Sequence, residues 1–212
     1  MTVHVATLDE GDVVHMGRVP VTTVARTVVD CARSLPGRDA LAIADAALHR
    51  GQVTMVDVQA VLAAQKGWPG SGRARHVVAL ADGRRESPLE SWSACAFERL
   101  GVPQPRWQVT LLDVDGVFLG RVDGWWDEAG LAGEADGRGK YALTGRGRTT
   151  PDEVEAVHEE RRRETAIRRT GAGLVRWGPR DVLRDGPATE FAAHLRSELA
   201  VVRRVSARAL DG

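Results

Sequence analysis

Residues 121–141 read Arg-Val-Asp-Gly-Trp-Trp-Asp-Glu-Ala-Gly-Leu-Ala-Gly-Glu-Ala-Asp-Gly-Arg-Gly-Lys-Tyr, and this stretch decides the fold of the C-terminal part of the chain. Apolar residues flank the turn signal Asp127-Glu-Ala-Gly130, so the pattern predicts two antiparallel strands joined by a short turn. In the simplest register Trp126 pairs with Leu131 across this turn. That register fixes which polar side chains face each other further along the two strands.

Two facing pairs of polar side chains follow from this register. Asp123 lies opposite Glu134, and Arg121 lies opposite Asp136. Because strand residues alternate, we expect all four side chains on one face of the sheet. Facing carboxylates repel each other, and a divalent cation is the simplest group that relieves this, since Mg²⁺ accepts hard oxygen ligands. The competing interpretations are solvated strand acids and, for Asp136, an ion pair with Arg121.

Two further residues can complete the site. Glu90 lies in the first turn of a helix expected over 88–100 and can add a third carboxylate, although a capping box with Ser87 also explains it. Lys140 follows the second strand and can orient a water molecule or neutralise a phosphate. It is one of only two lysines in a chain with 29 basic residues, but a plain surface role remains the alternative.

The pattern along the chain predicts an α+β (α/β) protein in two parts. Residues 1–66 form a small helical module with a hairpin, residues 67–86 a linker with a short helix, and residues 87–212 a second domain. The second domain has the order helix, three-strand meander, helix, strand, helix. Its expected elements are a helix at 88–100, strands at 107–112, 117–126 and 131–136, a helix at 151–170, a strand at 174–177 and a helix at 189–204.

Composition limits the functions that this chain can have. Its 212 residues carry 29 basic and 29 acidic side chains, and this balance excludes a polycation that binds nucleic acid by bulk charge. The two cysteines, Cys31 and Cys95, lack the spacing of a zinc ribbon or a disulfide framework. Because no apolar stretch approaches the ~18 residues that span a bilayer, we expect a cytoplasmic protein without a membrane partner.

Five separate motifs together resemble the PD-(D/E)XK nuclease superfamily, and more closely its very-short-patch-repair-like endonuclease domains. They are Ser87-Pro-Leu-Glu-Ser91, Arg121-Val-Asp123, Glu134-Ala-Asp-Gly-Arg-Gly-Lys-Tyr141, the helix Glu159–Arg169 and Val175-Arg176-Trp177. The resemblance implies a restriction-endonuclease-like αβββαβ core. It also implies hydrolysis of DNA phosphodiester bonds with Mg²⁺ (or Mn²⁺).

The resemblance assigns roles residue by residue. Glu90, Asp123 and Glu134 match the acids that hold the metal. The lysine of the superfamily stands two residues after the last acid, where this chain has Asp136, so Lys140 is the candidate replacement. In the loop that follows, Arg138, Arg146 and Arg148 are candidates for DNA phosphate contacts, with a solvated loop as the alternative.

The N-terminal part has a resemblance of its own. Residues 11–64, especially Arg18–Asp30, are similar to the middle region of AbiEi-like antitoxin proteins, in which a winged helix usually lies upstream; we expect this chain to lack it. This similarity and Asp136 support a second interpretation. The chain is then a catalytically inactive nuclease-fold DNA-binding or antitoxin module, with a toxin as its protein partner in a toxin–antitoxin or defence system.

Overall fold

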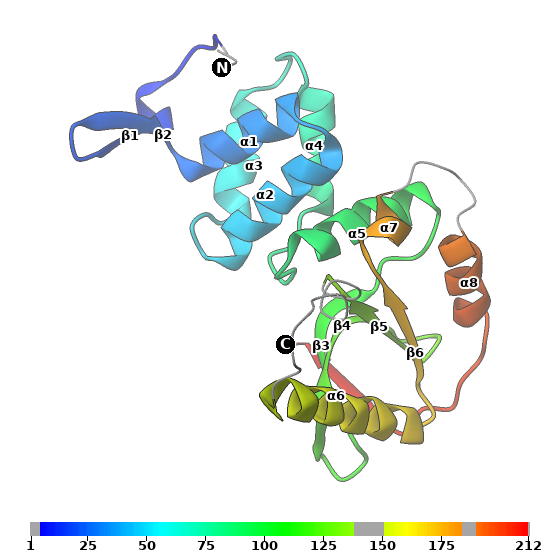
Figure 1. The fold of residues 1–212 in the computed structure, drawn as a ribbon. Coiled ribbons are helices and arrows are strands. Elements are labelled where there is room, and N and C mark those ends of the chain that lie inside the picture. The colour runs from blue at the N-terminus through cyan, green and yellow to red at the C-terminus, as the bar shows by residue number, and fades with distance from the viewer. Residues whose placement is uncertain (1–4, 138–150, 184–189, 212) are drawn as a thin grey trace. The chain divides into compact units, whose positions relative to one another are not determined.

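A computed structural model describes residues 5–137, 151–183 and 190–211 (Figure 1). The chain forms two compact units, Met1–Pro88 and Leu89–Gly212. Helices and strands occur in both, so the predicted α+β class is confirmed.

The first unit is a β-hairpin followed by helices. Its elements are a 3₁₀ turn (Glu10–Asp12), β1 (Val13–Met16), β2 (Val19–Thr22), α1 (Val24–Ser34), α2 (Gly37–His49), α3 (Met55–Ala64) and α4 (Ser71–Leu80). Gly17 adopts a φ of 64°, which the tight turn between the strands requires. The segment 67–86, expected to be a linker with a short helix, carries α4, and α4 packs against α1 and α2 inside this unit.

Buried arginines hold the first unit together. Arg85 and Asp45, with side chains 2% and 1% exposed, form an ion pair of 2.6 Å between α2 and the segment after α4. Arg26 of α1 is equally buried and lies 2.5 Å from Asp12 and 2.8 Å from Asp30. Each buried guanidinium therefore has a carboxylate partner, which is the condition for tolerating a charge in a core.

The second unit is built around a five-stranded mixed sheet with the order β6-β5-β4-β3-β7. Its elements are α5 (Pro88–Arg99), β3 (Arg106–Leu112), β4 (Phe118–Trp126), β5 (Leu131–Ala135), α6 (Pro151–Arg169), β6 (Gly173–Trp177), α7 (Pro179–Val182), α8 (Glu190–Leu199) and β7 (Arg208–Asp211). β5 and β6 pair in parallel, as the connection through α6 requires, and the other neighbours are antiparallel. The predicted succession of helix, three strands, helix and strand is confirmed.

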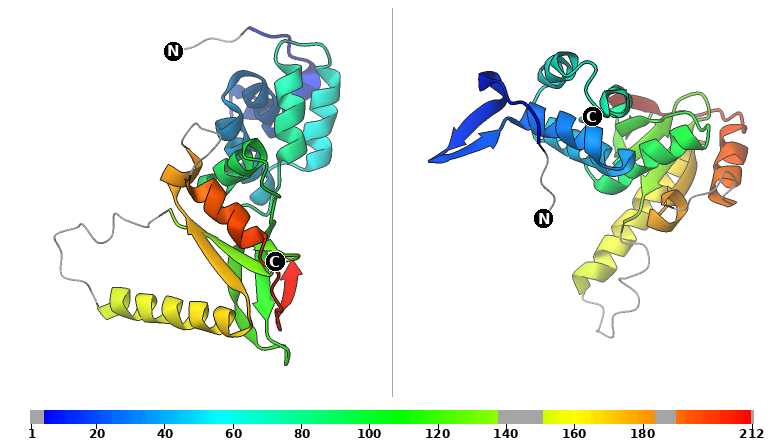
Figure 2. Two further views of the ribbon diagram at one scale, coloured as in Figure 1. Left: turned by 90° about the vertical axis from the view of Figure 1, so that its right-hand side faces the viewer. Right: turned by 90° about the horizontal axis from the view of Figure 1, so that it is seen from above.

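Two apolar clusters cover the sheet, and Figure 2 shows α6 and α8 separated by it. One cluster is aromatic and joins α5 and α8 to the strands through Phe97, Phe191, Trp107, Trp126 and Trp177. The other is mainly aliphatic and includes Val109, Leu111, Val122, Trp125, Ala132 and Ile167 of α6. The adjacent residues Trp125 and Trp126 thus belong to different clusters, as their opposite directions in the strand predict.

The C-terminal helix is shorter than predicted. The sequence pattern favours a helix over 189–204, but α8 ends at Leu199. The side chain of Arg203 donates to the carbonyl oxygen of Glu198 at 2.8 Å, which adds a second donor to the backbone N–H of Val201 at the helix end. The chain then returns to the sheet, where β7 pairs with the edge of β3. This strand was not predicted, and it covers backbone groups that β3 would otherwise expose.

Candidate active site

The structure brings Glu90 and Asp123 together through a third residue, Gln108. Glu90 lies in the first turn of α5 and is only 3% exposed. The side-chain Nε2 of Gln108, on β3, donates to Glu90 Oε2 at 2.8 Å and to Asp123 Oδ1 at 3.3 Å. Two carboxylates from a helix and a strand therefore share one amide group.

Both strands change their alternation where Gln108 and Asp123 face each other. In a regular strand Trp107 and Val109 would share a face, but Trp107 stacks on Phe97 whereas Val109 packs in the cluster with Ile167. Gln108 has a φ of 55°, the only positive value among the described residues other than glycine. This backbone conformation explains why the side chains of Trp107 and Val109 point to opposite faces of the sheet.

The same change occurs on β4. A Cβ on Gly124 would meet Trp177 in the aromatic cluster, whereas one on Gly120 would meet Arg163 of α6. The alternation expected for a regular strand therefore breaks near Asp123. A regular strand cannot direct Asp123 toward both α5 and α6, but a strand with this break can.

The register predicted for the central hairpin is confirmed close to the turn. Trp126 pairs with Leu131, and the ladder continues to Gly124 and Gly133. Within the described residues it ends there, so the backbone pairs predicted for Asp123 with Glu134, and for Arg121 with Asp136, are not formed. The reason is that Asp123 Oδ2 accepts the backbone N–H of Ala135 at 2.7 Å, which replaces the ladder with a side-chain contact.

Glu134 lies on the side of the sheet covered by α6. Its side chain is 12% exposed, and Glu134 Oε1 lies 3.0 Å from Arg163 Nη2. Arg163 also pairs with Glu160 at 2.8 Å and donates to the backbone oxygen of Arg121 at 2.6 Å. Glu160 is held in turn by Arg176 of β6. Arg163 thus partly neutralises Glu134, but it also contacts Glu160 and the backbone oxygen of Arg121.

The surroundings of both strand acids raise their pKa values above the ordinary ones. Burial raises the pKa of Asp123, although the N–H of Ala135 and the amide of Gln108 oppose this shift. Burial raises the pKa of Glu134 to about 7, the Arg163 guanidinium opposes this, and the carboxylates of Asp123 and Glu160 add to the rise. Carboxyl groups kept in so unfavourable a setting are typical of functional sites.

The oxygen atoms around Asp123 come from an amide as well as from carboxylates. Within the residues that the structure describes, no three histidine, cysteine, aspartate or glutamate side chains cluster closely enough to hold a metal ion. Gln108 Oε1 is buried beside the acids and accepts no hydrogen bond from the described part of the chain, whereas Glu134 Oε1 is ion-paired with Arg163 Nη2 at 3.0 Å. Carboxylate and amide oxygens are the ligands that Mg²⁺ and Mn²⁺ take.

The remaining predicted residues cannot be placed. Lys140 and the three loop arginines, Arg138, Arg146 and Arg148, lie outside the described residues. Conversely, sequence reasoning missed Gln108 as a site residue, since a glutamine between apolar strand residues carries no motif. It also missed Arg163, although the helical spacing from Glu160 was visible in the sequence.

Two curated proteins are similar to this chain. Both are uncharacterised proteins of Mycobacterium tuberculosis, from strains CDC 1551/Oshkosh and H37Rv, and each is 35% identical over 113 residues. The match covers 53% of this chain and 41% of each relative, so the chain spans less than half the length of the curated relatives that it matches. No family model matches the chain, and no solved structure matches it.

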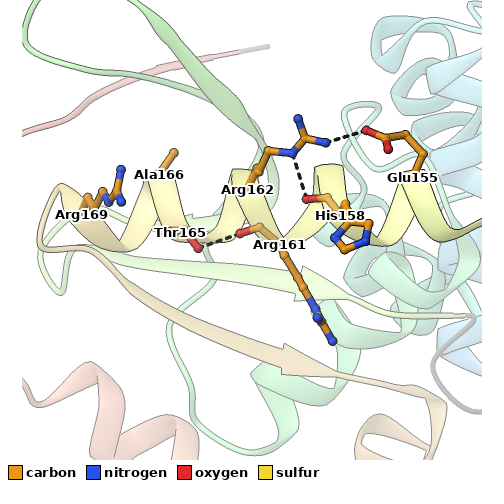
Figure 3. Close-up of a pocket in the computed structure, with 7 residues that line it drawn as sticks. All are labelled: Glu155, His158, Arg161, Arg162, Thr165, Ala166 and Arg169. Carbon is orange, nitrogen blue, oxygen red and sulfur yellow. Dashed lines mark hydrogen bonds and ion pairs between the residues drawn. The ribbon is translucent and has the colours of Figure 1, made fainter.

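A separate hollow lies along another face of α6. All its lining residues come from this helix: Glu155, His158, Arg161, Arg162, Thr165, Ala166 and Arg169 (Figure 3). Arg162 pairs with Glu155 at 2.5 Å, whereas Arg161 and Arg169 are exposed without an ion-pair partner among the described residues. Because Arg163 is not part of this lining, the hollow and the acid cluster use different faces of α6.

Among the helices of residues 5–137, 151–183 and 190–211, none combines the length and the apolar character that crossing a membrane requires.

Proposed function

We propose that the second unit is a divalent-metal-dependent endonuclease domain that hydrolyses DNA phosphodiester bonds. One observation carries this proposal: Asp123 is joined to Glu90 through the Gln108 amide and lies near enough to Glu134 to raise its pKa, and burial raises the pKa of both strand acids. Keeping these acids inside the protein costs stability, and a bound cation would offset that cost. The resemblance of the flanking motifs to very-short-patch-repair-like endonucleases supports the same function.

Each residue has a role in this proposal. Asp123 and Glu134 would hold Mg²⁺ or Mn²⁺, with Glu90 in support. When bound, the cation would supply Lewis acidity toward the phosphate and an activated water molecule. The N–H of Ala135 fixes one oxygen of Asp123 and leaves the other directed toward Gln108. Lys140 is the candidate for orienting the attacking water.

The substrate is a polyanion, and exposed arginines of α6 suit its phosphates. Arg161 and Arg169 have no carboxylate partner in the described part of the chain, so their charge is available for phosphate contacts. Such contacts position the nucleic acid without reading its sequence. The balanced net charge of the chain is compatible with this local arrangement.

A plasmid-nicking assay tests the proposal. The wild-type chain and Asp123→Asn are incubated with supercoiled DNA in Mn²⁺, in Mg²⁺ and in EDTA. We expect metal-dependent nicking by the wild type and at least a hundredfold less by Asp123→Asn. The control is Glu128→Gln, which removes an exposed acid from the turn of the same hairpin and is expected to nick normally. Equal nicking by Asp123→Asn and wild type would refute the proposal.

The ion pair between Glu134 and Arg163 favours a second candidate function. At 3.0 Å the guanidinium already supplies positive charge to an acid that the first proposal gives to the metal. Asp136 also stands where related nucleases have lysine. These features suit a catalytically inactive nuclease fold that binds DNA or a toxin protein. DNA binding in EDTA together with no nicking in either metal would support this second function over the first.

A further inference from the structure

Gln108 is held in an unfavourable conformation at the centre of the acid cluster. Its backbone φ is 55°, a value that residues other than glycine, asparagine and aspartate rarely adopt, and the residue is 5% exposed. Strained backbone of this kind persists only where the surrounding structure over-determines it, and it concentrates at functional sites. The strain directs the Gln108 side chain to a place that a regular strand residue does not reach.

The two halves of the Gln108 amide are used unequally. Nε2 donates to Glu90 and Asp123, whereas Oε1 is buried and accepts no hydrogen bond from the described residues. Ionised carboxylates only accept hydrogen bonds, so without a cation the NH₂ group must face them. A buried amide oxygen without a hydrogen-bond partner lowers the stability of the fold. Gln108 therefore has an unused acceptor beside two acids.

We propose that Gln108 is a cation ligand that switches on binding, an inference that rests on the proposed metal-dependent function. When a divalent cation enters, the amide turns about its terminal torsion and Oε1 takes the place of Nε2. Gln108, Glu90 and Asp123 then present oxygen atoms to the same ion. In the absence of the ion the NH₂ group returns and separates the two carboxylates.

The observed distances suit this exchange. The position of Nε2 lies 2.8 Å from Glu90 Oε2 and 3.3 Å from Asp123 Oδ1. An oxygen in that position would lie near enough to both carboxylate oxygens to share a divalent cation with them, without movement of the backbone.

The switch also explains why the residue is an amide. A carboxylate at position 108 would repel Glu90 and Asp123 whenever the ion is absent, and an apolar side chain would remove the amide donor that these two acids share. The amide alone donates to the acids in one state and coordinates in the other. Rotation exchanges two hydrogen bonds for a cation–oxygen contact, so it is favourable only while the cation is present.

Metal-dependent thermal unfolding without DNA tests the inference. The full chain is titrated with Mn²⁺ at pH 8 as the wild type, Gln108→Leu and Gln108→Glu. Gln104→Leu is the control, since it removes another amide of this unit, one that donates to the backbone oxygen of Ala94. Leucine and glutamine are both unbranched at Cβ, so Gln108→Leu leaves the backbone strain largely unchanged.

We expect distinct results from the variants. Gln108→Leu should bind Mn²⁺ at least tenfold more weakly than the wild type, and Gln104→Leu should bind with an unchanged Kd. Gln108→Glu should have a lower Tm than the wild type in EDTA and a larger rise in Tm with Mn²⁺. This second variant keeps the test decisive if Gln108→Leu does not fold.

Two results would overturn the inference, and they are distinguishable. In the first, Mn²⁺ raises the Tm of the wild type and of both Gln108 variants by the same amount and with the same Kd. Gln108 is then not a ligand, while the proposed function stands. If Mn²⁺ leaves the Tm of the wild type unchanged, the cation site is absent. The proposed function then fails, and the switch fails with it.

Discussion

Replacing Glu134 by glutamine should change how stability depends on pH. The Glu134 side chain is 12% exposed, and its burial raises the pKa to about 7 from an ordinary value of 4.5. The folded chain therefore holds a proton that the unfolded chain releases between these two values. Because the unfolded state binds fewer protons there, the free energy of unfolding falls as pH rises from about 4.5 to about 7.

The size of the effect follows from the shift. Each pKa unit corresponds to about 1.4 kcal/mol, so the full contribution is about 3 kcal/mol, of which about 2.5 kcal/mol is lost between pH 5 and pH 8. Glutamine resembles the protonated acid and does not titrate. Relative to the wild type, Glu134→Gln should therefore gain about 2.5 kcal/mol of stability between pH 5 and pH 8 in the absence of metal.

Urea unfolding at the two pH values, in EDTA, measures this gain. Glu128→Gln is the matched control, because Glu128 is exposed in the turn of the same hairpin, and we expect its stability difference from the wild type to be independent of pH. If Glu134→Gln differs from the wild type by the same amount at pH 5 and pH 8, the carboxyl of Glu134 is not protonated in the folded protein near neutral pH. The electrostatic basis of the site would then be wrong.

Three further predictions concern packing, buried charge and the cation. A Cβ on Gly133 would lie 2.6 Å from the ring of Trp177, so Gly133→Ala should lower the free energy of unfolding in urea by about 1–3 kcal/mol, and an unchanged value would contradict the packing. Asp45→Ala removes the carboxylate that lies 2.6 Å from the buried Arg85 and should cost about 3–5 kcal/mol in the same assay; a cost below 1 kcal/mol would mean that the buried pair does not stabilise this unit. Mn²⁺ at a hundred times its Kd should stabilise the wild type by about 2.7 kcal/mol at pH 8 but should not stabilise Asp123→Asn, and equal stabilisation of both would place the ion elsewhere.

The central hairpin was predictable because its determinants are local. The turn after Trp126 and the apolar residues beside it fix the register, and the structure has that register at the three pairs nearest the turn. The opposite directions of Trp125 and Trp126 follow from the same periodicity. Glu90 and Asp123 also lie in one cluster, as the sequence analysis proposed.

The features that were not predicted depend on contacts distant in sequence. The left-handed backbone of Gln108 has no local signal, since neither glycine nor a turn motif marks it, and the residue is stabilised by partners on α5 and β4. The approach of Arg163 to Glu134 depends on how α6 packs on the sheet. Strand β7 forms because β3 has a free edge, a property of the assembled sheet that the sequence of Arg208–Asp211 does not carry by itself.

A crystal of the full chain soaked in Mn²⁺ would locate the proposed ion by its anomalous scattering. We predict one strong peak about 2.1 Å from oxygen atoms of Asp123 and Glu134, with Gln108 Oε1 turned toward it. Ordered Asp123 and Glu134 side chains without a peak between them, and with Arg163 still paired to Glu134, would contradict a metal-dependent site.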